Sequence, residues 1–213
     1  MQALNSVQKE FLSALQKYDV VVFSAPAGCG KSFLAISEVT DWLKRGKVDK
    51  VVLTRAAVPM GRTLGMLPSS LREKFEPYLM PMLQVWWKRY GRNHYENCLS
   101  NGSLELLAPE YARGRSIDGV FVCDEAQSFT PDELYTLITR VEEGGKLVLI
   151  GDPTQTDISG EDGITWLKRF VKENPELGEF IKVVEATSDD IVRGGMCKAV
   201  VEAKEKEVGS VRR

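Results

Sequence analysis

Short apolar runs rich in β-branched residues recur along the chain, separated by polar or glycine-containing sequence. Five runs stand out and a sixth is weaker: Val20–Ser24, Val51–Arg55, Leu104–Ala108, Val120–Cys123 and Leu147–Ile150, then Ile181–Val184. Their hydrophobicity is nearly continuous and does not alternate, which is typical of strands buried on both faces. The pattern therefore predicts a mostly parallel β-sheet.

Stretches with apolar residues at helical spacing lie between several of these runs. Ser32–Lys44 ends before Gly46, and Asp132–Val141 ends before Gly144. Asn5 is suited to cap a first helix, and one face of that helix carries Val7, Phe11, Ala14, Leu15 and Tyr18. Strands that alternate with helices predict an α/β fold with helices on both faces of the sheet.

Two segments depart from this alternation. Residues 68–95 carry Pro68, Pro77 and Pro81 with Trp86, Trp87, Tyr90 and Tyr95, and we expect broken helices inserted into a connection of the sheet. Glu202 to Arg213 is charged, and we expect a frayed helix and tail there. At 213 residues, we expect a single domain over residues 1–213.

The composition is that of an ordinary globular protein, with 43% hydrophobic residues and a formal net charge of −2. This total neither favours nor excludes a nucleic-acid partner. No run reaches the roughly 18 apolar residues of a membrane helix, and residues 1–17 lack a signal-peptide core. The cysteines have no paired spacing, which favours a reducing cytoplasm: Cys29, Cys98, Cys123 and Cys197. His94 is the only histidine, so we expect oxygen ligands for any metal, as Mg²⁺ prefers.

A phosphate-binding loop is predicted between the first strand and the next helix. Its sequence is Ala25-Pro26-Ala27-Gly28-Cys29-Gly30-Lys31-Ser32. Glycines let the backbone wrap around phosphates, and the helix N-terminus adds the positive end of its dipole. We expect Lys31 to reach the β- and γ-phosphates of ATP and the Ser32 hydroxyl to bind Mg²⁺. Ala25 stands where the usual pattern has glycine, which is acceptable if the backbone there needs no positive φ.

Acidic and amide side chains follow two later strands. We expect Asp124, at the end of one strand, to hold Mg²⁺ and Glu125 to orient and deprotonate the attacking water. Gln155 follows the next strand, within Gly151-Asp152-Pro153-Thr154-Gln155. Alone, this sequence would be an ordinary Asp-Pro turn. As the third motif in a series on successive strands, it is expected to sense the γ-phosphate and the attacking water.

Further blocks resemble the PhoH-like family of ATPases, which is related to the core domain of superfamily 1 helicases. They are Thr54-Arg55-Ala56-Ala57-Val58, Gly61, Leu64-Gly65, Leu67-Pro68, Lys74, Pro77-Tyr78, Pro81, Arg113-Gly114-Arg115, Asp124-Glu125-Ala126-Gln127, Thr139-Arg140, Gly151-Asp152, Gln155, Asp157 and Asp190-Ile191-Val192-Arg193. The match runs from about Asn5 to Arg193. Departures leave the ATP-site residues in place and occur at Ala25, Ala56, Pro59, Ser69-Ser70 and Gly194.

The resemblance implies a RecA-like P-loop NTPase fold, hydrolysis of ATP with Mg²⁺, a link to RNA, and homo-oligomers that are often rings, hexamers among them. It also implies that Gln8, with Asn5 nearby, contacts the adenine edge; an exposed helix residue is an equally good interpretation of Gln8. The family often carries an additional nuclease-type or RNA-binding domain. This sequence resembles the minimal, single-domain ATPase.

An ATPase of this kind needs an arginine against the transferred phosphate. Since no second RecA-like domain is recognised, we expect a neighbouring subunit to supply it, with Arg193 as the first candidate and Arg113 and Arg115 behind it. Residues 86–95 mix aromatic side chains with cations, as single-strand binding sites do. An aromatic segment packed on the core is nevertheless the favoured interpretation, and Arg55 and Arg62 are further candidate contacts for nucleic acid.

The leading hypothesis is an ATPase coupled to single-stranded RNA, or to DNA, with or without helicase activity. An ATP-switched nucleic-acid-binding protein that unwinds nothing needs the same phosphate site, so the sequence does not separate the two. A small-molecule or nucleotide kinase would fit the size and the position of the loop. Glu125 and the Gln155 motif argue against a kinase, because a substrate hydroxyl is then the nucleophile.

Overall fold

The apolar runs form a parallel sheet of six strands in the order β3-β2-β4-β5-β1-β6. The structure is a computed structural model that describes residues 5–56, 75–112 and 114–211. The strands are β1 (Val20–Ser24), β2 (Val51–Arg55), β3 (Leu104–Leu106), β4 (Val120–Asp124), β5 (Lys146–Gly151) and β6 (Ile181–Glu185). The sixth and weakest apolar run, at residues 181–184, therefore also forms a strand, β6. β3 is shorter than predicted because Pro109 begins a helical turn, and proline cannot donate to a strand ladder.

Helices connect the strands. The α-helices are α1 (Ser6–Lys17), α2 (Lys31–Lys44), α4 (Met80–Ser100), α5 (Pro109–Ala112), α6 (Pro131–Ile138), α7 (Gly163–Glu173) and α8 (Gly195–Val211). Short 3₁₀ helices are η1 (Glu76–Leu79), η2 (Ala126–Ser128), η3 (Pro153–Gln155), η4 (Pro175–Glu179) and η5 (Ser188–Asp190). Asn5 caps α1 as predicted, accepting from the Gln8 N–H at 2.8 Å. α6 ends earlier than predicted because Val141 forms a bridge with Ile117 instead.

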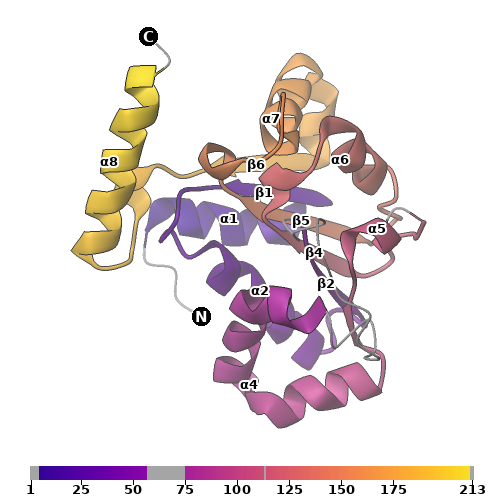
Figure 1. Cartoon of the computed structure of the whole chain (residues 1–213). Coiled ribbons are helices and arrows are strands. Elements are labelled where there is room, and N and C mark those ends of the chain that lie inside the picture. The colour runs from indigo at the N-terminus through magenta and orange to yellow at the C-terminus, as the bar shows by residue number, and fades with distance from the viewer. Residues whose placement is uncertain (1–4, 57–74, 113, 212–213) are drawn as a thin grey trace, which may run out of the picture.

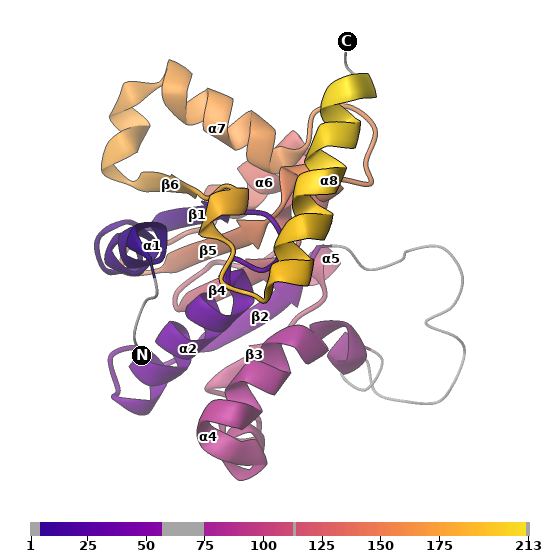
Figure 2. The same cartoon turned by 90° about the vertical axis from the view of Figure 1, so that its left-hand side faces the viewer.

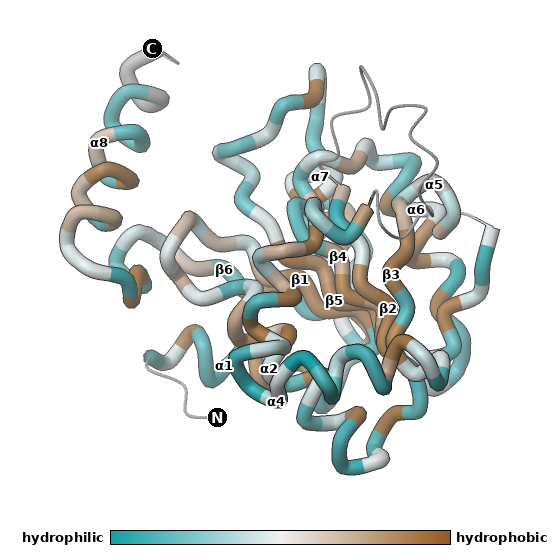
Figure 3. Tube along the Cα trace, turned by 60° about the horizontal axis from the view of Figure 1, so that its bottom comes forward, coloured by the Kyte–Doolittle hydropathy of each residue, from teal (hydrophilic) through white to brown (hydrophobic). Residues whose placement is uncertain are grey.

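Two helical layers enclose the sheet (Figure 1). Val21 and Phe23 of β1 belong to a core cluster shared with α1, α2 and α4, whereas Val20 and Val22 belong to a second cluster shared with α6 and α7. Successive strand residues face opposite layers, so both must be apolar, which explains the continuous hydrophobic runs. The strands accordingly form the hydrophobic centre of the molecule in Figure 3.

The aromatic segment packs against α2, as the favoured interpretation expected. Residues 68–74 lie outside the described part of the chain, and the remainder forms η1 and α4, with α4 interrupted at Gly91 (φ 80°, ψ 165°). Trp86 and Tyr95 are fully buried. Arg89 donates to both carboxylate oxygens of Asp41 on α2, through Nε at 2.8 Å and through its terminal nitrogen at 2.5 Å. The charge of Arg89 is therefore neutralised within the protein.

The last helix stands to one side of the body in Figure 1, and in the turned view of Figure 2 it runs in front of the sheet. α8 begins at Gly195, seven residues before the charged segment in which a helix was predicted. Ala, Glu and Lys, all good helix formers, dominate its middle. Met196 and Val200 remain largely exposed on it. Within the described residues, no helix combines the length and the apolar character needed to cross a bilayer.

The Asp41 carboxylate is expected to stabilise the packing of α4 on α2. Burial alone would raise the pKa of Asp41, but hydrogen bonds from Arg89 and Tyr90 outweigh it and lower the pKa. Asp41→Ala leaves the half-buried Arg89 guanidinium unpaired and should cost about 2–4 kcal/mol in urea unfolding at pH 7. Because the paired form is the carboxylate, this cost should shrink as the pH falls below about 4.

The exposed Asp49 provides a matched control on the loop that follows α2. Asp49→Ala should change the free energy of unfolding by less than about 0.5 kcal/mol. Equal unfolding midpoints for the two variants would show that the Asp41–Arg89 pair contributes no more than a surface ion pair.

Candidate active site

The carboxyl ends of β1, β4 and β5 lie at one edge of the sheet, because all strands are parallel. The phosphate-loop sequence follows β1, Asp124 is the last residue of β4, and Asp152 follows β5. β5 lies between the other two strands, so its end faces both the loop and the acidic pair. This edge is where open α/β sheets bind ligands.

The phosphate loop has the backbone that its glycines allow. Gly28 (φ 91°) and Gly30 (φ 83°) are both left-handed, and Gly30 is the N-cap of α2. Ala25 is buried, and Glu125 is the one non-glycine residue with positive φ in the described part of the chain. The condition under which alanine can replace glycine at position 25 is therefore met.

Lys31 supplies the cation of the loop. Its ammonium donates to the carbonyl oxygen of Ala25 and, at 3.1 Å, to that of Pro26. The side chain therefore folds back over the start of the phosphate loop. Burial lowers the pKa of Lys31, and the nearby carboxylates of Asp152 and Asp124 oppose this shift. A partly desolvated ammonium at a helix N-terminus suits a bound phosphate group.

Two segments far apart in the sequence, α1 and the residues just before α8, contact the phosphate loop. Gln8 on α1 is 3% exposed and donates from Nε2 to the Cys29 carbonyl at 3.1 Å. Gln8 is therefore not an exposed helix residue, and this interpretation was wrong. From the other end, the Val192 N–H donates to the Gly28 carbonyl at 3.1 Å, and Asn5 donates to the Asp190 carbonyl at 3.2 Å.

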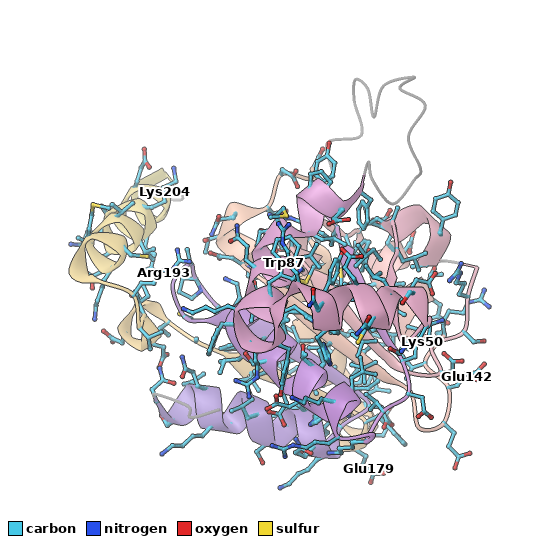
Figure 4. The ribbon with its side chains drawn as sticks, turned by 90° about the horizontal axis from the view of Figure 1, so that it is seen from below. Lys50, Trp87, Glu142, Glu179, Arg193 and Lys204 are labelled. Carbon is cyan, nitrogen blue, oxygen red and sulfur yellow. The ribbon has the colours of Figure 1, made fainter. Side chains whose placement is uncertain are left out.

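The candidate arginines lie in different places. A Cβ atom added to Gly28 would lie 3.5 Å from the Cβ of Arg193, so Arg193 stands beside the phosphate loop of its own chain. Its side chain is exposed where the chain enters α8 (Figure 4). Arg115 pairs with Glu105 near the amino ends of β2 and β4, at the opposite edge of the sheet. Arg113 and Arg62 lie outside the described residues.

The acidic pair is held at the end of β4. Asp124 is 4% exposed, and burial, reinforced by the adjacent charge of Glu125, raises its pKa to about 6. Its Oδ1 accepts from the Glu125 N–H at 3.0 Å. The Glu125 backbone is left-handed (φ 55°), a strained conformation for a residue with a side chain. Such strain at a strand end is common at functional sites.

Two side chains hold the Glu125 carboxylate. The sequence predicted a role in hydrolysis for neither of them. Arg55, at the end of β2, donates to Oε1 at 2.8 Å, and Gln127 donates to Oε2 at 2.7 Å. Gln127 is buried and also accepts from the Asp152 N–H at 3.0 Å. A Cβ on Gly151 would collide with the Gln127 amide, which explains the glycine. Two features of the sequence could have indicated these partners: an amide residue lies two positions after Glu125, and the second predicted strand ends in arginine.

Gln155 engages its own turn. Its Nε2 donates to Oδ2 of Asp152 at 2.5 Å, and Asp152 also caps η3 by accepting from the Thr154 N–H at 3.0 Å. The Asp-Pro turn is thus formed as the simpler interpretation described it. The role of Gln155 as a sensor stays a prediction.

The predicted Mg²⁺ ligands fit a metal that keeps most of its ligands from water and phosphate. Ser32 lies in the first turn of α2, and Asp124 is a buried carboxylate whose desolvated charge favours a cation. Across the described ranges there is no cluster of three His, Cys, Asp or Glu side chains that could hold a metal by themselves. Mg²⁺ is typically held through one or two protein groups together with nucleotide phosphates.

Comparison with known proteins agrees with this geometry. A family model described as PhoH-like protein matches residues 1–205. The PhoH-like protein of Bacillus subtilis is 34% identical over 201 residues, which cover 94% of this chain and 62% of that relative. Protein PhoH of Escherichia coli is 29% identical over 204 residues, covering 94% and 57%. The chain thus spans less than two thirds of the length of these relatives.

A solved structure shares the fold at low sequence identity. The large terminase of a thermophilic bacteriophage, in complex with ADP, has a TM-score of 0.54 and 13% identity. The similarity covers 92% of this chain and 48% of the terminase. The predicted RecA-like P-loop NTPase fold is confirmed.

Asp124 should lower the stability of the protein without ligands. Its raised pKa means that the folded state prefers the protonated acid, so the penalty is absent below its ordinary pKa near 4 and complete above pH 6. Asp124→Asn should therefore raise the free energy of unfolding at pH 8, in EDTA, by about 1–3 kcal/mol. The gain should shrink as the pH is lowered toward 5, and equal stability at pH 8 would contradict it.

Proposed function

The chain belongs to the PhoH-like family and has a P-loop NTPase fold, and we propose that it is a Mg²⁺-dependent ATPase that acts on single-stranded RNA. The observation that carries the ATPase proposal is Glu125, a residue with a left-handed backbone whose carboxylate lies beside the buried Asp124, at the edge of the sheet where the phosphate loop also lies. A phosphate loop alone would suit a kinase equally well, whereas this adjacent carboxylate supplies a base for water.

Each residue then has a defined part. The loop backbone and Lys31 bind the β- and γ-phosphates, while Ser32 and Asp124 would hold Mg²⁺, which neutralises charge on those phosphates when bound. Glu125 orients the attacking water and accepts its proton. Gln155, hydrogen-bonded to Asp152 at the end of β5, senses the γ-phosphate. Gln8, which donates to the Cys29 carbonyl of the loop, contacts the base of the nucleotide.

RNA, oligomeric assembly and location are the further parts of the proposal. The family resemblance supports a link to single-stranded RNA, with DNA as the alternative, and a homo-oligomer, a hexameric ring among the candidates. The cysteines of the described residues are free thiols, in keeping with a cytoplasmic protein. An ATP-driven switch that binds RNA without unwinding it remains the second candidate, supported by the contacts that already engage both oxygens of Glu125.

The first test is ATP hydrolysis with and without oligouridine RNA, by the wild type and by Glu125→Gln. We expect RNA to stimulate the wild type and the variant to lose at least about 100-fold in kcat, because it has no base. Lys31→Ala should lose ATP binding as well, and a strand-displacement assay then separates a helicase from a switch. Wild-type protein that binds ATP tightly without hydrolysing it would contradict the ATPase proposal.

The position of Arg193 predicts how mixed oligomers behave. Because Arg193 stands beside its own phosphate loop, we expect it to act on the nucleotide of its own subunit. Mixing inactive Glu125→Gln with inactive Arg193→Ala protein should then restore no ATPase activity. Recovery of activity on mixing would instead place Arg193 in the site of a neighbouring subunit. Arg115→Ala is the comparison variant for the same mixing experiment. Arg115 lies at the opposite edge of the sheet, so it could act only in the active site of another copy.

A further inference from the structure

Both oxygens of the Glu125 carboxylate are held by the protein itself. Oε1 accepts from Arg55 at 2.8 Å, and Oε2 accepts from Gln127 at 2.7 Å. Gln127 is buried and accepts in turn from the backbone N–H of Asp152, so it links the end of β4 to the end of β5. Arg55 lies on the opposite side, at the end of β2, where its Cα is paired in register with that of Asp124.

The strand order gives the Arg55 contact a direction. β2 borders β4 on one side, while β5 and then β1, with its phosphate loop, lie on the other. Arg55 therefore draws one oxygen of Glu125 away from the phosphate loop. A base that activates water against the γ-phosphate must turn toward the loop. The Arg55–Glu125 pair thus ties one oxygen of the base to the β2 side of the acidic pair.

Arg55 is placed to respond to a second ligand. Its side chain is 22% exposed, and among the described residues it also contacts the Tyr78 carbonyl at 3.2 Å and an Asp124 oxygen at 3.9 Å. Tyr78 belongs to η1, which leads into α4. A guanidinium held by two carboxylates and one carbonyl, with part of its surface in water, can exchange a carboxylate for a phosphate oxygen, which it binds equally well.

We propose that Arg55 is a positioning residue that restrains Glu125 until a phosphate of single-stranded nucleic acid binds Arg55 and releases the carboxylate toward the nucleotide. This rests on the proposed ATPase function and adds the means by which RNA stimulates it. Glu125 and the RNA phosphate compete for one guanidinium. Binding of RNA and activation of the base are therefore the same exchange of partners.

The competition can be measured without any turnover. In the absence of nucleotide, fluorescence anisotropy with labelled oligouridine should show tighter binding to Glu125→Gln than to wild type, by about two- to fivefold, since a partly exposed ion pair no longer competes. Arg55→Gln should weaken binding and reduce the slope of log affinity against log salt by about one, as expected for one lost phosphate contact. Adding Glu125→Gln to Arg55→Gln should bring no further gain.

The rate gives the second readout. Arg55→Gln should raise the ATPase kcat without RNA by about two- to fivefold, because the same restraint is gone, and should abolish the stimulation by RNA. Arg169→Gln is the matched control: Arg169 pairs with Glu161 and Glu173 on and beside α7, away from the site. That variant should keep the wild-type rate and stimulation.

The outcomes separate this proposal from the proposed function. If wild type neither hydrolyses ATP nor binds RNA, the proposed function fails. If it hydrolyses ATP but ignores RNA, a faster Arg55→Gln still supports the restraint on Glu125, and only the releasing ligand is wrong. If Arg55→Gln falls toward the rate of Glu125→Gln, Arg55 itself acts on the phosphate and the restraint is overturned. An unchanged basal rate also overturns it.

Discussion

The parallel direction of every strand is the constraint on which the site depends. All carboxyl ends lie at one edge of the sheet. The loop after β1, the acids at the end of β4 and the turn after β5 therefore meet there as a consequence of the strand direction alone. Burial on both faces requires the strands to be apolar throughout, so polar chemistry begins only where a strand ends. Asp124 shows the cost of this boundary. It is the last residue of β4, still buried, and its charge is disfavoured until a cation reaches it.

Residues from neighbouring strands hold Glu125, the acid next to Asp124. Arg55 from β2, Gln127 after β4 and the Asp152 backbone after β5 form one chain of hydrogen bonds through Glu125. Each member is fixed by a different strand, so the orientation of Glu125 reports the relative positions of three strands. A left-handed backbone at Glu125 persists only because these neighbours determine it.

The sequence predicted the strands, their direction and the chemistry of the strand ends, because continuous apolar runs and glycine-rich turns are local signals. It placed Asn5, Lys31 and Asp124 correctly in their elements. It did not predict the Arg55–Glu125 pair, because the two residues are 70 positions apart and only the register of β2 with β4 aligns them. The start of α8 was also missed, since glycine at 194 and 195 hides a helix whose apolar residues face water.

The phosphate loop is also where distant parts of the chain meet. Gln8 binds the Cys29 carbonyl, Val192 binds the Gly28 carbonyl, and a Cβ on Gly28 would lie 2.9 Å from Sγ of Cys197 in the first turn of α8. α8 stands to one side of the sheet and its flanking helices (Figure 1). The base of α8 therefore packs directly on the phosphate loop. Gly28 is consequently needed twice, for its positive φ and for the space that the C-terminal segment occupies.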